Sequence, residues 1–516
     1  TIIDQAASPV LLATYVHRRQ ETSRLARTLL IFAMDDDAGS SSSSSPPPLR
    51  IVIVPWLAFG HLLPYLELAE RLAERGHRVS YVSTPRNLAR LPPLNPATAP
   101  RVDLVPIPLP LVDGLPDGAE STNDVPDEKR ELHWKAFDGL AEPFTRFLAH
   151  ACADEATRPH WILADCFHHW VAAAALDHKV PCAMLLPTAA VLAITQRPPS
   201  ERGGSRAVTL PRYEQADTAH LRDDQGASGM SFVQRWSLTK ERCIVGAIRS
   251  CVEWEPESFQ LVAPLLGMPV MPLGLLPPSI SGGRRRHGAN TTDESEHATV
   301  GWLDAQPPGS VLYVALGSEV PLRAEQVHEL ALGLELAGTR FLWALRKPSG
   351  AAVLGDAADM LPHGFQERTH GQGLVTTGWV PQMSILAHGA VGGFLTHCGR
   401  NSLIEGLLFG HPLVMLPVFG DQGPNARQME AKKVGLQVAR DDKDGSFDRH
   451  GVAGAVQAVM VEGESRRGFV AGAAKMQQVV ADAKLQERYV DEFVQQLRSY
   501  TVRGDFTTAP PTSSSS

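Results

Sequence analysis

A histidine and an aspartate that each follow an apolar run could act together on a proton. His61 comes shortly after residues 50–55 (RIVIVP), and Asp165 ends residues 161–165 (WILAD). A histidine side chain with its ordinary pKa of about 6.5 is mostly neutral at pH 7 and can accept a proton. An aspartate bonded to its far ring nitrogen would fix the tautomer and stabilise the imidazolium. Taken singly, a loop histidine is more often a surface or capping residue, and Asp165 could equally cap a helix.

A second group of chemically suited residues is found in residues 379–422, which run from WVPQ to FGDQ. Residues 396–402 (THCGRNS) pass from an expected strand directly into an expected helix. Free backbone N–H groups and the positive end of the helix dipole then face one point, which favours an anion such as a phosphate.

The other residues of this stretch suit the remaining parts of a nucleotide and a sugar. Asn401 and Glu405 are four apart and share a helix face, and Glu405 suits ribose hydroxyls. Trp379 offers a flat face for a base, and Asp421 with Gln422 offers groups for sugar hydroxyls. Alone, Trp379 would be a core residue and Glu405 part of a solvated helix face; their order makes the functional interpretation stronger.

Apolar strand-like runs alternate with helical patterns on both sides of a composition break at residues 280–298. This alternation predicts an α/β fold with parallel sheets covered on both faces. Ligands of such sheets bind beyond the carboxyl ends of the strands. The pairs Gly60-His61 and Gly317-Ser318, together with Asp165 and residues 397–402, fall at such ends. We therefore expect two domains whose ligand sites face each other.

Composition excludes several classes of function. The chain has 516 residues and a formal net charge of −8, so it lacks the basic surplus of a nucleic-acid or anionic-membrane binder. No apolar run is long enough to span a bilayer. Its 6 cysteines form no CxxC pair, which favours reduced, buried thiols and makes a zinc site unlikely. Met34 is the first methionine, so we expect residues 1–33 to be a non-native extension.

Residues 379–422 closely resemble the signature box of the plant family of UDP-sugar-dependent glycosyltransferases of secondary metabolism. The likeness rests on WVPQ, HCG-x-NS, the following glutamate, GHP and the final DQ, and it extends over nearly all of residues 50–500. The stretches PWLAFGHLLP, DGAESTNDVP, HHWVAAAA and YVALGSEVPL resemble the branch that extends sugars on terpenoid or flavonoid glycosides, such as steviol glycosides.

The resemblance implies a GT-B fold, in which two Rossmann-like domains face each other. We expect an extension or disordered segment (1–48), an acceptor-binding domain (49–279), a linker (280–298), a UDP-sugar-binding domain (299–484), a helix returning to the first domain (485–500) and a disordered tail (501–516).

The resemblance also implies the roles of individual residues. His61 matches the catalytic base and Asp165 its partner. The donor-binding positions are Trp379 and Val380 for the uracil, Gln382 and Glu405 for the ribose, Ser318, His397, Gly399, Arg400, Asn401 and Ser402 around the diphosphate, and Asp421 and Gln422 for the sugar. Residues near the expected acceptor site are Trp56, Phe59, Phe167, His168 and Trp170, which could equally be core.

The implied reaction is an inverting, single-step transfer that needs no cofactor and no metal. His61 would take the proton of the acceptor hydroxyl while UDP leaves from the opposite face of the sugar. The expected partners are a UDP-sugar and a small terpenoid or flavonoid acceptor, often already glycosylated. We expect a cytoplasmic monomer.

Position 400 departs from the family, which usually has tryptophan there. Arginine pairs bidentately with carboxylates, which glucuronic acid has and glucose lacks. UDP-glucuronate is therefore an alternative donor, although retained Gln422 and the surrounding sequence favour UDP-glucose. A UDP-sugar-binding protein with impaired catalysis is an alternative of another class. A nicotinamide-dependent enzyme is remote, because no G-x-G-x-x-G follows the first strand.

Overall fold

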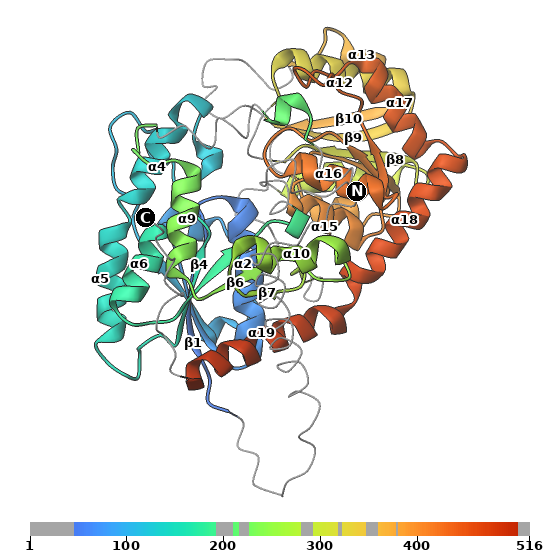
Figure 1. The fold of residues 1–516 in the computed structure, drawn as a ribbon. Helices are drawn as coiled ribbons and strands as arrows, with labels where there is room; N and C mark the ends of the chain where they lie inside the picture. Colours follow the sequence, from blue (N-terminus) through green and yellow to red (C-terminus); the bar gives the residue numbers. More distant parts are fainter. Residues whose placement is uncertain are drawn as a thin grey trace, which may run out of the picture. The chain divides into compact units, whose positions relative to one another are not determined.

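The apolar runs of the sequence form the strands of two parallel β-sheets (Figure 1). The computed structural model describes residues 46–191, 210–215, 226–279, 293–317, 322–346, 360–377 and 380–503. The first sheet has the order β3-β2-β1-β4-β5-β6-β7 and the second the order β10-β9-β8-β11-β12-β13. Each order begins at the middle of the sheet and reverses there, as in Rossmann folds. The predicted α/β class is therefore confirmed.

The strands of the first sheet are β1 (Arg50–Val54), β2 (Arg78–Ser83), β3 (Val102–Pro106), β4 (Trp161–Asp165), β5 (Cys182–Leu186), β6 (Val245–Ile248) and β7 (Val270–Pro272). Those of the second are β8 (Val311–Ala315), β9 (Arg340–Leu345), β10 (Gly373–Thr377), β11 (Val391–Thr396), β12 (Leu413–Met415) and β13 (Gly435–Gln437).

The helices before the second sheet are α2 (Phe59–Glu74), α3 (Pro85–Ala89), α4 (Arg130–Asp138), α5 (Ala141–Cys152), α6 (His169–Asp177), α9 (Phe232–Arg242), α10 (Pro256–Leu266) and α11 (Asp293–Asp304). Those after β8 are α12 (Ala324–Ala337), α13 (Phe365–Arg368), α14 (Gln382–Leu386), α15 (Arg400–Leu408), α16 (Gln422–Ala431), α17 (Arg449–Met460), α18 (Glu464–Ala481) and α19 (Ala483–Arg503).

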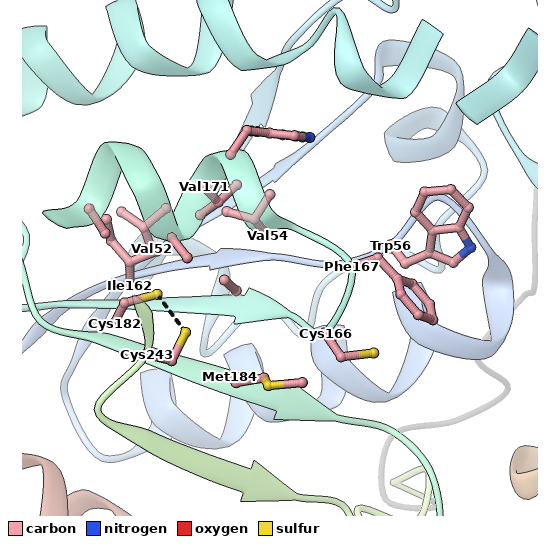
Figure 2. Close-up of a cluster of buried hydrophobic side chains, with 14 of the residues drawn as sticks. Val52, Val54, Trp56, Ile162, Cys166, Phe167, Val171, Cys182, Met184 and Cys243 are labelled. Carbon is pink, nitrogen blue, oxygen red and sulfur yellow. Dashed lines mark hydrogen bonds between the residues drawn. The ribbon is translucent and has the colours of Figure 1, made fainter. Parts of the chain in front are cut away.

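Successive side chains of a strand point to opposite sides of the sheet. Because the central strands are apolar at nearly every position, both faces of each sheet are apolar and buried there. In β1, Val52 and Val54 join one core cluster, which α5 and α6 cover. Ile51 and Ile53 join the other, which α2 and α19 cover. Figure 2 shows the first of these clusters, with Trp56 and Phe167 side by side at one end of it.

The second sheet repeats this arrangement with other helices. On β8, Tyr313 belongs to a cluster formed with α15 and α18, while Val314 belongs to one formed with α12 and α17. A strand buried on both faces needs an almost unbroken apolar run, which is why residues 311–315 (VLYVA) contain no charge.

The last helix, α19, packs against the first sheet although it follows the second in sequence. Its residues Val490 and Phe493 lie in the core cluster of that sheet. The indole N–H of Trp161 on β4 donates to the carbonyl of Leu497 at 3.0 Å. Arg71 of α2 also pairs with Glu487 at 3.0 Å. The C-terminal helix thus braces α2.

Several elements differ from the sequence-based expectation. The helical pattern of residues 131–151 predicts one helix, but the structure has two, α4 and α5, that meet at Gly139 and Leu140. The pattern of residues 425–434 also predicts a helix, and α16 begins three residues earlier, at Gln422. Residues 293–298, expected in the linker, already belong to α11. Residues 1–45, 280–292 and 504–516 lie outside the described part, so the disorder expected at both ends stays a prediction.

Candidate active site

The two candidate proton-transfer residues lie at the point where the first sheet reverses its strand order. β1 and β4 are neighbours in the middle of the sheet, and the chain leaves them toward opposite faces. His61 is in the first turn of α2, just after β1, and Asp165 is the last residue of β4. Parallel neighbours bring their carboxyl ends to one edge, so residues far apart in sequence meet there.

His61 and Asp165 form a close hydrogen-bonded pair. The distance between His61 Nδ1 and Asp165 Oδ2 is 2.6 Å, and their side chains are 18% and 0% exposed. Burial raises the pKa of Asp165, but the His61 ring and the Trp56 backbone N–H together hold it below its usual value. Asp165 is therefore ionised at neutral pH and keeps the Nδ1 proton on His61. The other ring nitrogen, Nε2, is then the basic one.

Aromatic rings surround this pair on the first domain's side. The ring of Phe167 lies 6.0 Å from that of His61 and 5.6 Å from that of Trp56. Trp134, which sequence reasoning missed, stacks on Trp56 at 4.0 Å. The guanidinium of Arg235 lies 4.7 Å from the Trp134 ring. The region beside His61 is therefore lined by packed aromatic rings.

The five residues expected near the acceptor do not share one environment. Trp56, Phe167 and Trp170 belong to one core cluster. His168 is 1% exposed, and burial lowers its pKa to about 3. Phe59 packs against the core on the opposite face of the sheet and contacts the guanidinium of Arg90 at 5.0 Å. Of the five, Phe167 contacts the ring of His61, and Trp56 contacts Phe167 in turn.

The turn from β11 into α15 contains a backbone conformation that residues other than glycine seldom adopt. Cys398 has a φ of 66°, in the left-handed region. Its N–H donates to Thr396 Oγ1 at 3.2 Å, and its carbonyl accepts from Asn425 Nδ2 at 3.2 Å. The turn is thus held by hydrogen bonds on both sides, which offsets the cost of this conformation.

His397 stands between two glycines at this turn. A Cβ on Gly317 would lie 2.6 Å from His397 Nε2, and a Cβ on Gly399 would clash with the same ring. Burial lowers the pKa of His397 to about 4, so the ring is neutral at pH 7. Its Nδ1 is buried and has no hydrogen-bond partner in the described residues. His397 can therefore supply a neutral N–H donor, but no positive charge.

The two expected ribose binders are brought together by the structure. Gln382 Nε2 donates to Glu405 Oε2 at 2.6 Å, and the hydroxyl of Tyr313 donates to Gln382 Oε1 at 3.2 Å. Burial raises the pKa of Glu405, although Gln382 and Arg249 oppose the shift. Val380, which precedes this pair, is buried. Trp379 and Ser318 lie outside the described residues, so their expected roles stay predictions.

Asp421 and Gln422 are oriented at the start of α16. Asp421 Oδ2 accepts a hydrogen bond from Asn425 at 3.1 Å. Gln422 Oε1 accepts from the backbone of Val418 at 2.8 Å and of Phe419 at 3.0 Å, which leaves its NH₂ group to donate elsewhere. Burial raises the pKa of Asp421, although the hydrogen bond from Asn425 and the charges of Arg400 and His61 oppose the shift.

Arg400, the residue that departs from the family pattern, is buried. Its guanidinium lies 4.9 Å from the ring of Trp254, and Nη2 donates to the carbonyl of Arg249 at 2.9 Å. The other two nitrogens, Nε and Nη1, are also inaccessible and have no hydrogen-bond partner in the described residues. Asn401 and Ser402 follow it in the first turn of α15. The expectation of an arginine fork open to the donor is not what the structure shows.

Sequence reasoning missed the residues that surround Arg400 from the first domain. Arg249 and Trp254 follow β6, a strand of only four residues that was not predicted. An apolar run ended by a lone arginine, residues 244–249 (IVGAIR), was the available signal.

Two features are absent from the described part of the chain. It contains no group of three or more histidine, cysteine, aspartate or glutamate residues placed to hold a metal ion. None of its helices combines the length and the apolar composition that crossing a membrane requires.

Comparisons with known proteins show the family to which the chain belongs. Residues 286–467 match the family model described as UDP-glucoronosyl and UDP-glucosyl transferase. The chain is 39% identical to UDP-glycosyltransferase 91D2 of Stevia rebaudiana, over 88% of this chain and 95% of the relative. It is 34% identical to soyasaponin III rhamnosyltransferase of Glycine max, over 88% of this chain and 96% of the relative.

A solved structure shows the same fold. Phytolacca americana UGT2, in complex with UDP-2fluoro-glucose and pterostilbene, matches with a TM-score of 0.66 and 26% identity, over 87% of this chain and 100% of that one. The chain therefore belongs to the plant UDP-glycosyltransferase family of secondary metabolism and is an enzyme with the GT-B fold that takes a UDP-sugar donor and a small-molecule acceptor.

Proposed function

We propose that the enzyme transfers glucose from UDP-glucose to a hydroxyl of a lipophilic, often already glycosylated, plant metabolite, with His61 as the base. The observation that carries this proposal is the 2.6 Å contact between His61 and buried Asp165. His61 Nε2 takes the acceptor proton while the acceptor oxygen forms a bond to the anomeric carbon. The bond from that carbon to the UDP oxygen breaks on the opposite face, so the configuration inverts.

The leaving diphosphate would be held at the turn from β11 into α15. The N–H groups of the first turn of α15 and the positive end of its dipole suit the growing negative charge. His397, which is neutral, would add a hydrogen bond there. Glu405 and Gln382 would hold the ribose, and Asp421 and Gln422 the sugar hydroxyls. Gln382 and Glu405 are already bonded to each other, Gln422 to the backbone, and Asp421 to the side chain of Asn425.

The environment of Arg400 supports glucose over glucuronate as the donor sugar. A carboxylate is recognised by the N–H fork of an arginine. Here one N–H bonds to a backbone carbonyl and the remaining nitrogens are enclosed beside Trp254. A glucuronate carboxylate could reach them only if this contact opened. The arginine instead stabilises the contact between α15 and the loop after β6.

The acceptor proposal rests on the aromatic rings beside His61 and on relatives. Trp56 and Phe167 give that region a flat, apolar character that suits a terpenoid or flavonoid. One relative is named for a soyasaponin, and the compared solved structure contains pterostilbene. A terpenoid glycoside such as a steviol glycoside is therefore the first acceptor to test, followed by a flavonoid glycoside.

The test is a donor panel on the wild type and on Arg400→Trp, with one terpenoid glycoside and one flavonoid glycoside as acceptors. UDP-glucose, UDP-glucuronate and UDP-rhamnose are compared by product formation. We expect the wild type to prefer UDP-glucose, and the substitution to leave the glucose-to-glucuronate ratio unchanged. A wild-type preference for UDP-glucuronate that Arg400→Trp abolishes would overturn the glucose proposal. UDP binding without turnover on any acceptor would instead indicate a binding protein.

A further inference from the structure

Arg249 is a buried cation that the first domain places against the donor turn of the second. It lies just after β6 and is 2% exposed. Its Nε donates to the carbonyl of Leu275 at 2.8 Å, and its Nη2 faces the carbonyl of Leu276 at 3.4 Å. Two backbone carbonyls thus hold the guanidinium plane in one orientation.

The remaining terminal nitrogen of this guanidinium, Nη1, donates to the side-chain oxygen of Asn401. Asn401 is the second residue of α15, at the N-terminal turn that faces the expected diphosphate. A guanidinium can only donate hydrogen bonds, whereas an amide has one accepting oxygen and one donating NH₂ group. The contact therefore determines which end of the Asn401 amide faces Arg249.

An amide held in this way offers its NH₂ group on its other side. There it can donate to a phosphate oxygen beside the free N–H groups of the helix. Without the arginine, the amide could rotate by half a turn and present its oxygen, which would repel the same phosphate. The orientation of one amide thus decides whether it attracts or repels an anion.

The backbone of Arg249 holds the neighbouring residue of the same turn. Its carbonyl accepts the hydrogen bond from Arg400 Nη2 at 2.9 Å. The side chain and the carbonyl of one residue therefore fix the first two residues of α15. Burial, and next the charge of Arg400, lower the pKa of Arg249 to about 9. The guanidinium is still protonated at pH 7, so it also adds positive charge beneath the turn.

We propose that Arg249 is a positioning residue for the donor diphosphate, which orients the Asn401 amide so that its NH₂ group binds a phosphate oxygen. The inference rests on the proposed function in one respect, namely that the turn before α15 holds the diphosphate. It adds a residue of the first domain to the donor site and makes donor binding depend on the contact between the two domains.

The test compares the binding of UDP and of uridine to the full-length protein by calorimetry. Uridine lacks the phosphates but keeps the base and ribose. Arg249→Met removes the charge and the fork while keeping a long apolar side chain. We expect it to weaken UDP binding roughly 10- to 100-fold, because a hydrogen bond to a charged group contributes on that scale. We expect uridine binding to stay within about twofold of the wild type.

Further variants distinguish a change in the orientation of the Asn401 amide from general structural damage. Asn401→Asp keeps an acceptor for Arg249 but has no N–H to donate, so UDP binding should weaken at least as much. The double variant Arg249→Met with Asn401→Ala should lose little more UDP affinity than Asn401→Ala alone, because both substitutions disrupt the same interaction. Arg71→Met removes another buried arginine, which contacts Glu67, Glu487 and Pro277, and should keep the wild-type ratio of UDP to uridine affinity.

The possible results are distinguishable. The inference is overturned if Arg249→Met weakens UDP and uridine equally, or weakens neither. It is equally overturned if Asn401→Asp binds UDP as well as the wild type does, a result that remains available if Arg249→Met does not fold. A wild type that binds UDP no better than uridine refutes the proposed diphosphate site itself, before any variant is considered.

Discussion

The proton-transfer pair combines one inaccessible and one accessible residue. Asp165 is fully buried, whereas the His61 side chain keeps 18% of its surface exposed. An isolated carboxylate would not stay charged when buried, but the pKa of Asp165 is held down by His61 and the Trp56 N–H. The His61 imidazole can therefore contact an acceptor while its hydrogen bond to Asp165 fixes its orientation.

Removing either partner should slow the chemical step more than donor binding. We expect His61→Ala to lower kcat roughly 10²- to 10⁴-fold, the usual contribution of a general base. Asp165→Asn should also lower kcat, because an amide can stabilise neither the correct tautomer nor the imidazolium. The measurement is product formation at saturating UDP-sugar, alongside the UDP dissociation constant. Wild-type kcat in His61→Ala would exclude this residue as the base.

The donor turn is expected to stabilise the diphosphate through N–H groups and buried arginine rather than a metal ion. Exhaustive chelation with EDTA followed by gel filtration should therefore leave kcat and the KM for UDP-sugar unchanged. The check is activity before chelation, after it, and after adding back Mg²⁺ or Mn²⁺. A loss of activity that one of these ions restores would contradict this assignment.

At the scale of single residues, the sequence predicts which residues form the site but not where their side chains point. His61 and Asp165 were found because one follows an apolar run and the other ends one, and the structure places them in contact. Arg400 was predicted to reach the donor, yet it turns toward Trp254. That direction depends on a loop from the other domain, which local sequence patterns do not contain.

Among the elements, α16 connects the donor site to a segment of the first half of the chain. Glu214 forms two parallel hydrogen bonds with Arg427 of α16, at 2.7 and 2.8 Å, and both side chains are 13% exposed. Tyr213 packs under Arg440 at 4.9 Å. Residues 210–215 thus hold one side of α16, the helix that begins with Gln422.

This ion pair should contribute measurably to stability because its geometry is bidentate and its atoms are largely shielded from water. A double-mutant cycle of Glu214→Gln and Arg427→Met, measured by urea unfolding, should give a coupling free energy of about 1–2 kcal/mol. The matched control is Glu142 with Arg146, an exposed pair on α5, which should give no more than about 0.5 kcal/mol. Equal coupling for the two pairs would refute the prediction.

The sequence predicted the long elements better than the short ones. β1 and β4 are mostly apolar, and the runs at residues 50–55 and 161–165 located them nearly to the residue. β7 and β13 have three residues each and pair with one neighbour at a sheet edge, and sequences this short carry little signal. The break between α4 and α5 lies at a glycine, which the helical pattern around it obscured.

At the scale of the whole molecule, both sheets bury histidines that must remain neutral. Burial lowers the pKa of His133 to about 4 and that of His168 to about 3 in the first domain, and that of His397 to about 4 in the second. In the unfolded chain, a histidine has a pKa of about 6.5. Between these values the unfolded state binds more protons than the folded state, so stability must fall as the pH falls.

His133 offers the clearest test of this pH dependence because it is 2% exposed and lies apart from the donor turn. Its pKa is about 6.5 in the unfolded chain and about 4 in the folded protein. Between pH 7 and pH 5, His133 should therefore lower the free energy of unfolding by about 2 kcal/mol. His133→Gln keeps a hydrogen-bond donor but cannot become charged, so its stability should depend less on pH by that amount. Urea unfolding at pH 7, 6 and 5 measures the difference, and His150→Gln, at an exposed position on α5, serves as the control. If His133→Gln loses stability with acid as steeply as the wild type, His133 is not a source of the acid sensitivity.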